Sequence, residues 1–470
     1  GLNVVGARAD LVATNVANAS TPGYVRRALS VSETILGGQT SGVQINGIDR
    51  SVDARLTEER RRLGSDMAQA DVLSETWGKF SQRIGDDIES SVLFRNMAAF
   101  DTALKDAAQS PESTTHANQV VLSANNLVSE FTSLSSMISQ ERHRADQDIA
   151  ASVDALNASL RDIEDLNRSL ASIDRGSAEA AALFDERGRV LDRISEFLPI
   201  QTHSRESGAI DVLTSEGVFL VAGDAREVNF TPSNAVGSAQ SLAGGTLSGL
   251  TVDGTDITPG VGTFGAVSSG SLAALFTLRD TDLPELETQL DTMAQDLIDR
   301  FSDPSIDATN PAGSPGLFLD SDAPAGTGIA GRLQLNALVD PNQGGAVWRL
   351  RDGLGAAAPG SPGDNTILSN LSNAFETVRS INVPGLQGGF TATDLVAQLG
   401  SLAGQKRVQN ESVLSSTTLQ FGAVQQAEGD ATSVDIEQEM QNLLIIEQAF
   451  AANARVIEAA SQMVRELMEI

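Results

Sequence analysis

The sequence predicts a mainly α-helical protein with β additions, an α+β fold in which the N- and C-terminal helices pair in one terminal domain. Apolar residues recur at alternating steps of three and four at both ends of the chain and through most of residues 51–198, which is the pattern of helices with one apolar face. Gly-rich, β-prone stretches separate these regions. A chain of 470 residues allows roughly three domains of about 150 residues each.

The first helix is expected over about residues 1–19. Its apolar stripe consists of Leu2, Val5, Ala9, Val12, Val16 and Ala19. Ser20-Thr21-Pro22-Gly23 follows and ends the helix, because proline cannot continue the hydrogen-bond ladder and glycine tolerates positive φ. Residues 24–50 are β-prone and rich in glycine. Since Gly1 already lies inside the helical pattern, we also expect this helix to be shortened at its N-terminal end.

Helix is expected to dominate residues 51–198. One predicted face carries Leu73, Trp77, Phe80, Ile84 and Ile88 and continues through Met97, Phe100 and Leu104. Ser110-Pro111-Glu112-Ser113 breaks it, and a second long stripe carries Ile149, Val153, Leu156, Leu160, Ile163 and Leu170. Gly176 and Pro199 limit the next helix. Residues 209–221 predict a hairpin, residues 236–271 predict loops and short strands, and residues 272–301 predict another helix.

The last segment has the clearest pattern in the chain. Ten heptad positions from 436 to 468 include eight apolar residues, with Glu447 and Ser461 as the exceptions; this predicts a coiled-coil seam. The short N-terminal stripe is marginal as an isolated helix, so we expect the two ends to pack together or on neighbouring copies. The predicted assembly seam therefore comprises Leu2, Val5, Val12, Val16, Ile436, Met440, Leu443, Phe450, Ile457 and Val464.

Three nested domains follow from these patterns. Residues 1–35 and 435–470 form the expected terminal polymerisation domain. Residues 36–302 and 364–434 form a long helical bundle with β-hairpins at about 200–270. Residues 303–363 are rich in Pro, Gly and Asp and have few periodic apolar residues, so a small outer β or irregular domain is expected there.

The composition excludes several kinds of chemistry. A net charge of −30 disfavours nucleic acid and anionic membrane surfaces, and no apolar run is long enough to suggest membrane insertion. Cysteine is absent and only three histidines are present. We therefore predict no catalytic, cofactor-binding or metal-binding residues. Gly260 to Gly265 match the spacing of a dinucleotide-binding loop but lack its flanking strand and helix. Arg60, Arg61 and Arg62 are expected on an exposed helix turn, and Trp77 in the core.

A resemblance to a known family adds to this reading. Residues 15–27, Asn-Val-Ala-Asn-Ala-Ser-Thr-Pro-Gly-Tyr-Val-Arg-Arg, resemble the N-terminal signature of flagellar axial proteins, which include rod, hook and hook-associated proteins. Residues 42–53, 280–286 and 442–456 are similar to segments of the hook-associated family at the junction of hook and filament. The signature turn comprises Asn15, Asn18, Thr21, Pro22, Gly23 and Tyr24. Its polar side chains and Pro-Gly pair suit a type II turn that aims the chain away from the first helix.

The resemblance implies an elongated flagellar axial protein that is secreted through the export channel and catalyses no reaction. It implies a ring of identical subunits that contacts the hook protein and the second hook–filament junction protein, and an export chaperone on the C-terminal helix. A hook or rod subunit is the nearest alternative, and would have a mainly β middle. A flagellum-associated cell-wall hydrolase with a cleft in 200–363 is a third reading.

Overall fold

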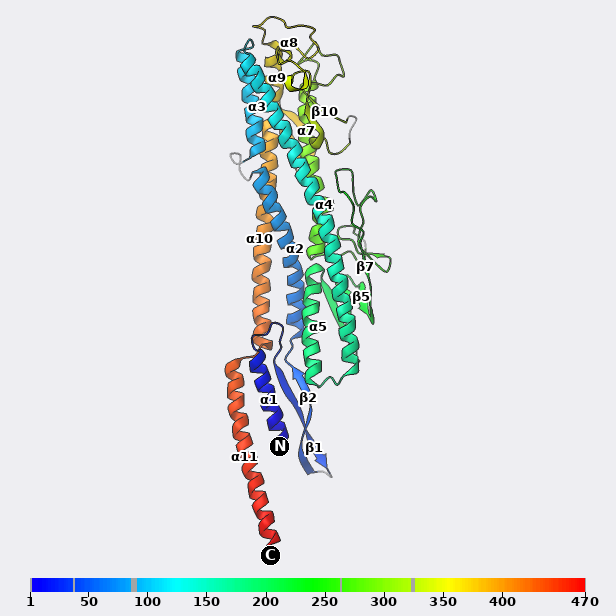
Figure 1. Cartoon of the computed structure of the whole chain (residues 1–470), viewed down its shortest axis with the longest axis vertical. Coiled ribbons are helices and arrows are strands. Elements are labelled where there is room, and N and C mark those ends of the chain that lie inside the picture. Colours follow the sequence, from blue (N-terminus) through cyan, green and yellow to red (C-terminus); the bar gives the residue numbers. More distant parts are fainter. Residues whose placement is uncertain (1, 37–38, 86–90, 263, 323–325, 470) are drawn as a thin grey trace.

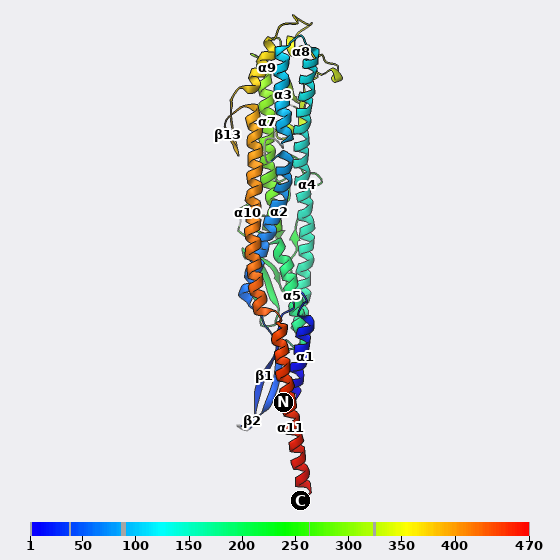
Figure 2. The same ribbon diagram turned by 90° about the vertical axis from the view of Figure 1, so that its left-hand side faces the viewer.

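The structure is a computed structural model that describes residues 2–36, 39–85, 91–262, 264–322 and 326–469. It is an elongated rod of helices with both termini toward one end (Figures 1 and 2). The mainly helical fold with small β additions is confirmed. The middle of the chain is mainly helical, whereas the hook or rod alternative requires a mainly β middle. Ile88, which we assigned to a helix face, lies outside the described residues.

The N-terminal unit consists of helix α1 (Leu2–Asn18) and a two-stranded hairpin, β1 (Arg27–Leu36) and β2 (Gln39–Arg50). The strands are antiparallel, with register shifts between Ser30 and Val31 and between Thr34 and Ile35. Figure 1 shows the hairpin projecting beside α1. The expected boundary between residues 35 and 36 falls within this hairpin, so both strands belong to one structural unit.

Three successive helices form much of the rod: α2 (Ala54–Ile84), α3 (Val92–Gln109) and α4 (Thr114–Ser172). Asp53, Ser91 and Ser113 cap their first turns by accepting hydrogen bonds from backbone N–H groups. The predicted break at 110–113 separates α3 from α4. With 59 residues, α4 spans about 90 Å and runs through nearly the whole body (Figure 1).

One hydrophobic core fills the end of the rod remote from the termini. It joins α3 and α4 to α7 (Leu283–Ser302), α9 (Thr366–Glu376) and the first part of α10 (Ala392–Thr432). The rings of Phe100, Phe301, Phe318 and Phe375 meet here with centroid separations of 5.5–6.4 Å, a geometry that adds to the burial of their area.

The segment 303–363, which we expected to form a separate outer domain, shares this core. Its short pair β10 (Phe318–Asp320) and β11 (Leu333–Leu335) places Phe318, Leu333 and Leu335 in the same cluster as Phe100. Much of the remaining segment is irregular, with η2 (Ala330–Arg332), η3 (Pro341–Gln343) and α8 (Arg349–Asp352) as its helical turns.

A second core lies nearer the termini, between α4, α5 (Ala178–Phe197) and α6 (Ser271–Thr277). The predicted stripe is confirmed here, because Ile149, Leu156, Leu160 and Ile163 are fully buried. The predicted hairpin is also present as two strands of a four-stranded sheet; the sheet contains β3 (Ile200–Ser204), β4 (Ile210–Thr214), β5 (Phe219–Ala222) and β6 (Asp224–Ala225). A three-stranded sheet contains β7 (Val228–Asn229), β8 (Thr251–Val252) and β9 (Thr255–Asp256).

A buried ion cluster ties α4 to the π-helical turn η1 (Leu278–Asp282), which continues into α7. Arg279 Nη1 lies 2.7 Å from Asp146 Oδ1, and both side chains are fully buried. Arg142 donates from Nε to the Arg279 carbonyl at 3.0 Å and lies 3.8 Å from Glu287. Burial, reinforced by the charge of Asp291, raises the pKa of Glu287 to about 7.

Two long helices complete the chain. Helix α10 packs along α2 and ends at Thr432, and α11 (Ile436–Met468) then runs beside α1. A hairpin of β12 (Arg379–Val383) and β13 (Leu386–Phe390) precedes α10; we did not predict it. The predicted heptad segment is thus a continuous helix at the end of the chain.

Candidate assembly interface

Helices α1 and α11 lie side by side at one end of the rod (Figures 1 and 2). On α1 the buried residues are Val4, Leu11, Val12 and Asn15. Of the four α1 residues in the predicted seam, Val12 is therefore buried, whereas Leu2, Val5 and Val16 are half-buried. The buried face of α1 is therefore displaced by about one residue from the predicted apolar stripe.

The apolar stripe of α11 is exposed. Ile436, Met440, Leu443, Phe450, Ile457 and Val464 have exposed fractions between 37% and 55%. Leu444, Ile445, Val456 and Met463 beside them are also exposed. Apolar surface of this extent, on a helix whose only buried residue is Glu439, marks a surface that needs a partner.

A different edge of α11 is shielded within the chain. Glu439 is buried, and Asn442, Ile446, Ala449 and Asn453 are half-buried at the same three-four spacing. Apolar periodicity in the sequence does not mark this edge, because three of its five residues are polar. A groove of about 390 Å³ between the two helices is lined by Val5, Ala9, Leu443, Ile446 and Phe450, among others. Leu443 and Phe450 therefore flank the contact between α1 and α11 while remaining partly open to solvent.

The signature residues form a hydrogen-bonded corner at the end of α1. Asn15 donates from Nδ2 to the Arg27 carbonyl at 2.9 Å and accepts from the Arg27 N–H at 3.2 Å. The Tyr24 hydroxyl donates to Asn15 Oδ1 at 2.9 Å, and Tyr24 lies under the Arg27 guanidinium at 4.7 Å. Burial raises the pKa of Tyr24. This buried asparagine therefore fixes the start of β1 to α1.

The turn itself spans Thr21 to Tyr24. The Tyr24 N–H donates to the Thr21 carbonyl at 3.1 Å, and Gly23 has φ of +75°, as a type II turn requires at this position. Asn18 donates to the Thr14 carbonyl and accepts from the Thr21 hydroxyl. A Cβ atom at Gly23 would lie 2.9 Å from Arg189 Cγ, so a larger residue would have to displace the Arg189 side chain as well as adopt a positive φ.

Ion pairs connect this corner to the body. Arg27 and Arg50 both pair with the buried Asp185 of α5, at 2.8 and 2.5 Å. Arg60 and Arg61 pair with Asp192 at 3.0 and 2.7 Å. The expectation of an exposed turn is therefore wrong for these two arginines. Asp192 lies 132 and 131 residues from them in the sequence, and Glu428, which also pairs with Arg60, lies 368 residues from it.

Arg62 alone of the three arginines is exposed and pairs locally, with Glu59 and Asp66. Trp77 is confirmed in the core, 4% exposed, and donates from Nε1 to Asp282 at 2.9 Å.

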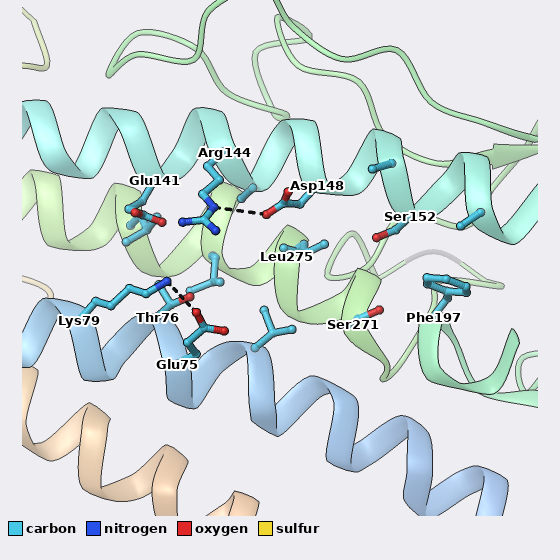
Figure 3. A pocket seen from close by; sticks show the side chains of 16 residues that line it. Glu75, Thr76, Lys79, Glu141, Arg144, Asp148, Ser152, Phe197, Ser271 and Leu275 are labelled. Carbon is cyan, nitrogen blue, oxygen red and sulfur yellow. Dashed lines mark ion pairs between the residues drawn. The ribbon is translucent and has the colours of Figure 1, made fainter. Parts of the chain in front are cut away.

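Two other features that could suggest a site are a groove in the body of the rod and the Gly260 loop. A groove of about 400 Å³ between α2 and α4 (Figure 3) has rims formed by Glu75 with Lys79 and Arg144 with Asp148. Each pair lies within one helix, with N–O distances of 2.8 and 3.8 Å, so each cation already has a carboxylate. The lining residues include no histidine or cysteine. The Gly260 loop is not followed directly by a helix, since α6 begins at Ser271.

In the described ranges, no three His, Asp or Glu side chains converge as metal ligands would. None of the helices seen in the described part of the chain has both the length and the hydropathy needed to cross a bilayer.

Comparisons with known proteins agree on one family. The model of the flagellar hook-associated protein FlgK helical domain matches residues 82–317, half of the chain. Flagellar hook-associated protein 1 of Escherichia coli K12 is 23% identical over 64% of this chain and 55% of its own length. The Salmonella typhimurium protein of the same name is 23% identical over 64% of this chain and 54% of its own length.

The chain thus spans about half the length of these curated relatives. Hook-associated protein 1 of Bacillus subtilis 168 is 18% identical over 97% of this chain and 94% of its own. The solved hook junction protein FlgK of Burkholderia pseudomallei has a TM-score of 0.46 and 17% identity, and the match covers 56% of this chain and 47% of that one. By the match of its helical middle, the chain belongs to the family of flagellar hook-associated proteins that contain the FlgK helical domain.

Proposed function

We propose that this protein is a structural subunit that joins the hook to the filament in the bacterial flagellum, and that it catalyses no reaction. The observation that carries the proposal is the exposed apolar face of α11 beside α1. A lone copy leaves this face in water, whereas neighbouring copies would bury it. The family match supports the placement at a hook–filament junction.

Charge favours the same surface for contact between copies. Each chain carries a net charge of −30, so two copies repel one another wherever their acidic surfaces meet. The predicted α11 seam contains a single charged residue, Glu447. Copies that meet along this seam gain apolar burial with little like-charge repulsion, and repetition of the contact around an axis gives a closed ring.

The partners in this proposal are the hook protein on one side of the ring and the second junction protein on the other. An export chaperone would cover the apolar face of α11 before secretion, which places the mature protein outside the cell. The absence of cysteine supports this route, because a chain exported unfolded through a narrow channel cannot then be trapped by disulfides.

Deletion of the gene in its own bacterium tests the proposal. Cells should carry hooks without filaments and should release flagellin into the medium. Expression of the wild-type chain should restore filaments. Normal filaments in the deletion strain would contradict the assignment to the junction.

Complementation with seam variants tests the residues. Leu443→Asp, Phe450→Asp and Ile457→Asp together should give no filaments, because three carboxylates would replace the apolar contact. The matched control is Gln441→Asp, Gln448→Asp and Gln462→Asp, which adds the same charge to exposed positions of the same helix. Both proteins should keep the wild-type melting of the body. Restored motility with the first triple variant would show that the seam is not the contact.

A further inference from the structure

A cavity of about 510 Å³ lies at the joint between the terminal helices and the body. Its walls come from the signature turn, the start of α2, the middle of α5 and the end of α10. These segments are remote in sequence, so a molecule held among them would link the terminal unit to the rod. The volume lies in the range of small-molecule sites in proteins.

The walls of this joint cavity are rich in guanidinium groups. Five arginines line it: Arg50, Arg60, Arg61, Arg187 and Arg189. This concentration contrasts with a chain that has almost twice as many carboxylates as cations, 62 against 32. Four carboxylates also line it, those of Glu58, Asp185, Asp192 and Glu428, so arginines outnumber carboxylates by one here, the reverse of the balance in the whole chain.

The carboxylates around the cavity are already shared. Asp185 pairs with Arg27 as well as Arg50, and Asp192 pairs with Arg60 as well as Arg61. Each of these carboxylates thus balances two cations. Arg60 has a second carboxylate partner in Glu428, and Arg189 pairs with Glu186. Of the five arginines that line the cavity, Arg187 therefore lacks a carboxylate partner among the described residues.

Arg187 is the cation that this network leaves without a counter-ion. Its Nη1 donates to Asn167 Oδ1 at 3.3 Å and to the Gly208 carbonyl at 2.8 Å, and its guanidinium stacks on Phe184 at 5.0 Å. All of these partners are neutral. Within the described residues, no carboxylate forms an ion pair with Arg187. Burial, together with the charges of Arg50 and Arg61, lowers the pKa of Arg187 to about 10.

We propose that the joint cavity binds a small tetrahedral oxyanion of the phosphate or sulfate class, with Arg187 as its principal donor and Arg50 and Arg61 beside it. A guanidinium presents two parallel N–H groups that match the oxygens of such an anion. The anion supplies the counter-charge that a half-buried cation otherwise lacks. Because the bound ion touches walls from several segments, it stiffens the connection between the terminal helices and the body.

Calorimetric titration of the purified full chain with inorganic phosphate tests the proposal, with chloride at matched ionic strength as the reference. Wild type should bind one phosphate per chain. Arg187→Gln should bind roughly tenfold more weakly or not at all, because it loses a charged hydrogen-bond donor. Arg187→Lys keeps the charge without the planar fork and should be intermediate.

The matched control is Arg193→Gln, which removes an exposed arginine from the same helix; its side chain is 50% exposed. This variant should bind phosphate like wild type. Absence of saturable binding in the wild-type chain overturns the proposal, as does equal weakening in Arg187→Gln and Arg193→Gln. The measurement uses isolated protein and no flagellar assembly, so its outcome is independent of the proposed junction role.

Discussion

Arg26 donates from Nε to Oε1 of Glu439 at 2.7 Å and so joins two segments 413 positions apart. Glu439 is only 1% exposed and is the one buried residue of α11. The Arg26 N–H also donates to the carbonyl of Thr432, the last residue of α10, at 2.9 Å. Arg26 therefore spans the break between α10 and α11 and sets the direction in which α11 leaves the body.

Glu439→Gln should loosen this joint without unfolding the rod. The amide keeps the shape of the side chain but loses the charge that pairs with Arg26. We expect hydrogen-exchange protection in the first turns of α11 to fall about tenfold, since hydrogen bonds to charged groups contribute about 1.5–3 kcal/mol. Glu458→Gln, an exposed change in the same helix, should leave the exchange unaltered. Equal protection in both variants would show that the ion pair does not hold the joint.

Asn15→Ala should disrupt the corner at the end of α1. The change removes both hydrogen bonds to Arg27 and the one from the Tyr24 hydroxyl, and it leaves buried groups of Arg27 without partners. We expect a loss of about 2–4 kcal/mol in the local stability of α1 and β1. Tyr24→Phe removes a single bond and should cost about 1 kcal/mol. Hydrogen exchange of α1 measures both, and a larger effect of Tyr24→Phe would contradict the central role of Asn15.

Glu287 should make the stability of the body depend on pH. Its pKa is about 7 in the folded protein, against 4.5 for an ordinary glutamate, chiefly because of burial. A raised pKa means that the folded state holds this proton more tightly, so its stabilising contribution is complete below about pH 4.5 and is lost as the pH rises through 7. The contribution is at most about 3 kcal/mol.

Urea denaturation of wild type and Glu287→Gln at pH 5 and pH 8 isolates this group from the other carboxylates. The variant should gain stability relative to wild type at pH 8, because its amide is never ionised. A difference between the two proteins that stays constant with pH would contradict the assignment to Glu287.

Helices with a regular apolar face could be predicted from the sequence, and elements defined by distant partners could not. Leu156 and Leu160 lie in a stripe that repeats along α4, so local spacing suffices to place them. Arg60 and Arg61 carry no such signal, because only the fold brings Asp192 to them. The β12–β13 hairpin did carry a local signal that we overlooked. Ile381 and Val383 alternate with polar residues, and Pro384-Gly385 forms the turn between the strands, with Gly385 at φ of +78°.

At the candidate interface, too, the features marked by local apolar spacing could be predicted, and those set by distant partners could not. The apolar stripe of α11 is visible in the sequence as a heptad pattern, and the structure leaves it exposed. The edge that faces the rest of the chain is marked by Glu439, Asn442 and Asn453, which no search for apolar periodicity detects. The partner of Glu439 is Arg26, within the signature segment, and only the fold shows the two together.

The central claim is that the apolar face of α11 contacts other copies of this chain. Because the sequence contains no cysteine, a single Phe450→Cys substitution provides a unique probe of that contact, and cysteine is itself a small apolar residue. Attachment of a maleimide-linked photocrosslinker to this thiol, followed by irradiation of isolated flagella, should yield covalent dimers of this chain. The photocrosslinker reacts with whichever side chain of the neighbouring copy faces it, whereas a disulfide would require position 450 to face itself across a contact repeated around a ring. The exposed Asp165→Cys on α4, where the side chain is 73% exposed, should remain monomeric. Filament-bearing flagella in which Phe450→Cys forms no dimers would contradict the account.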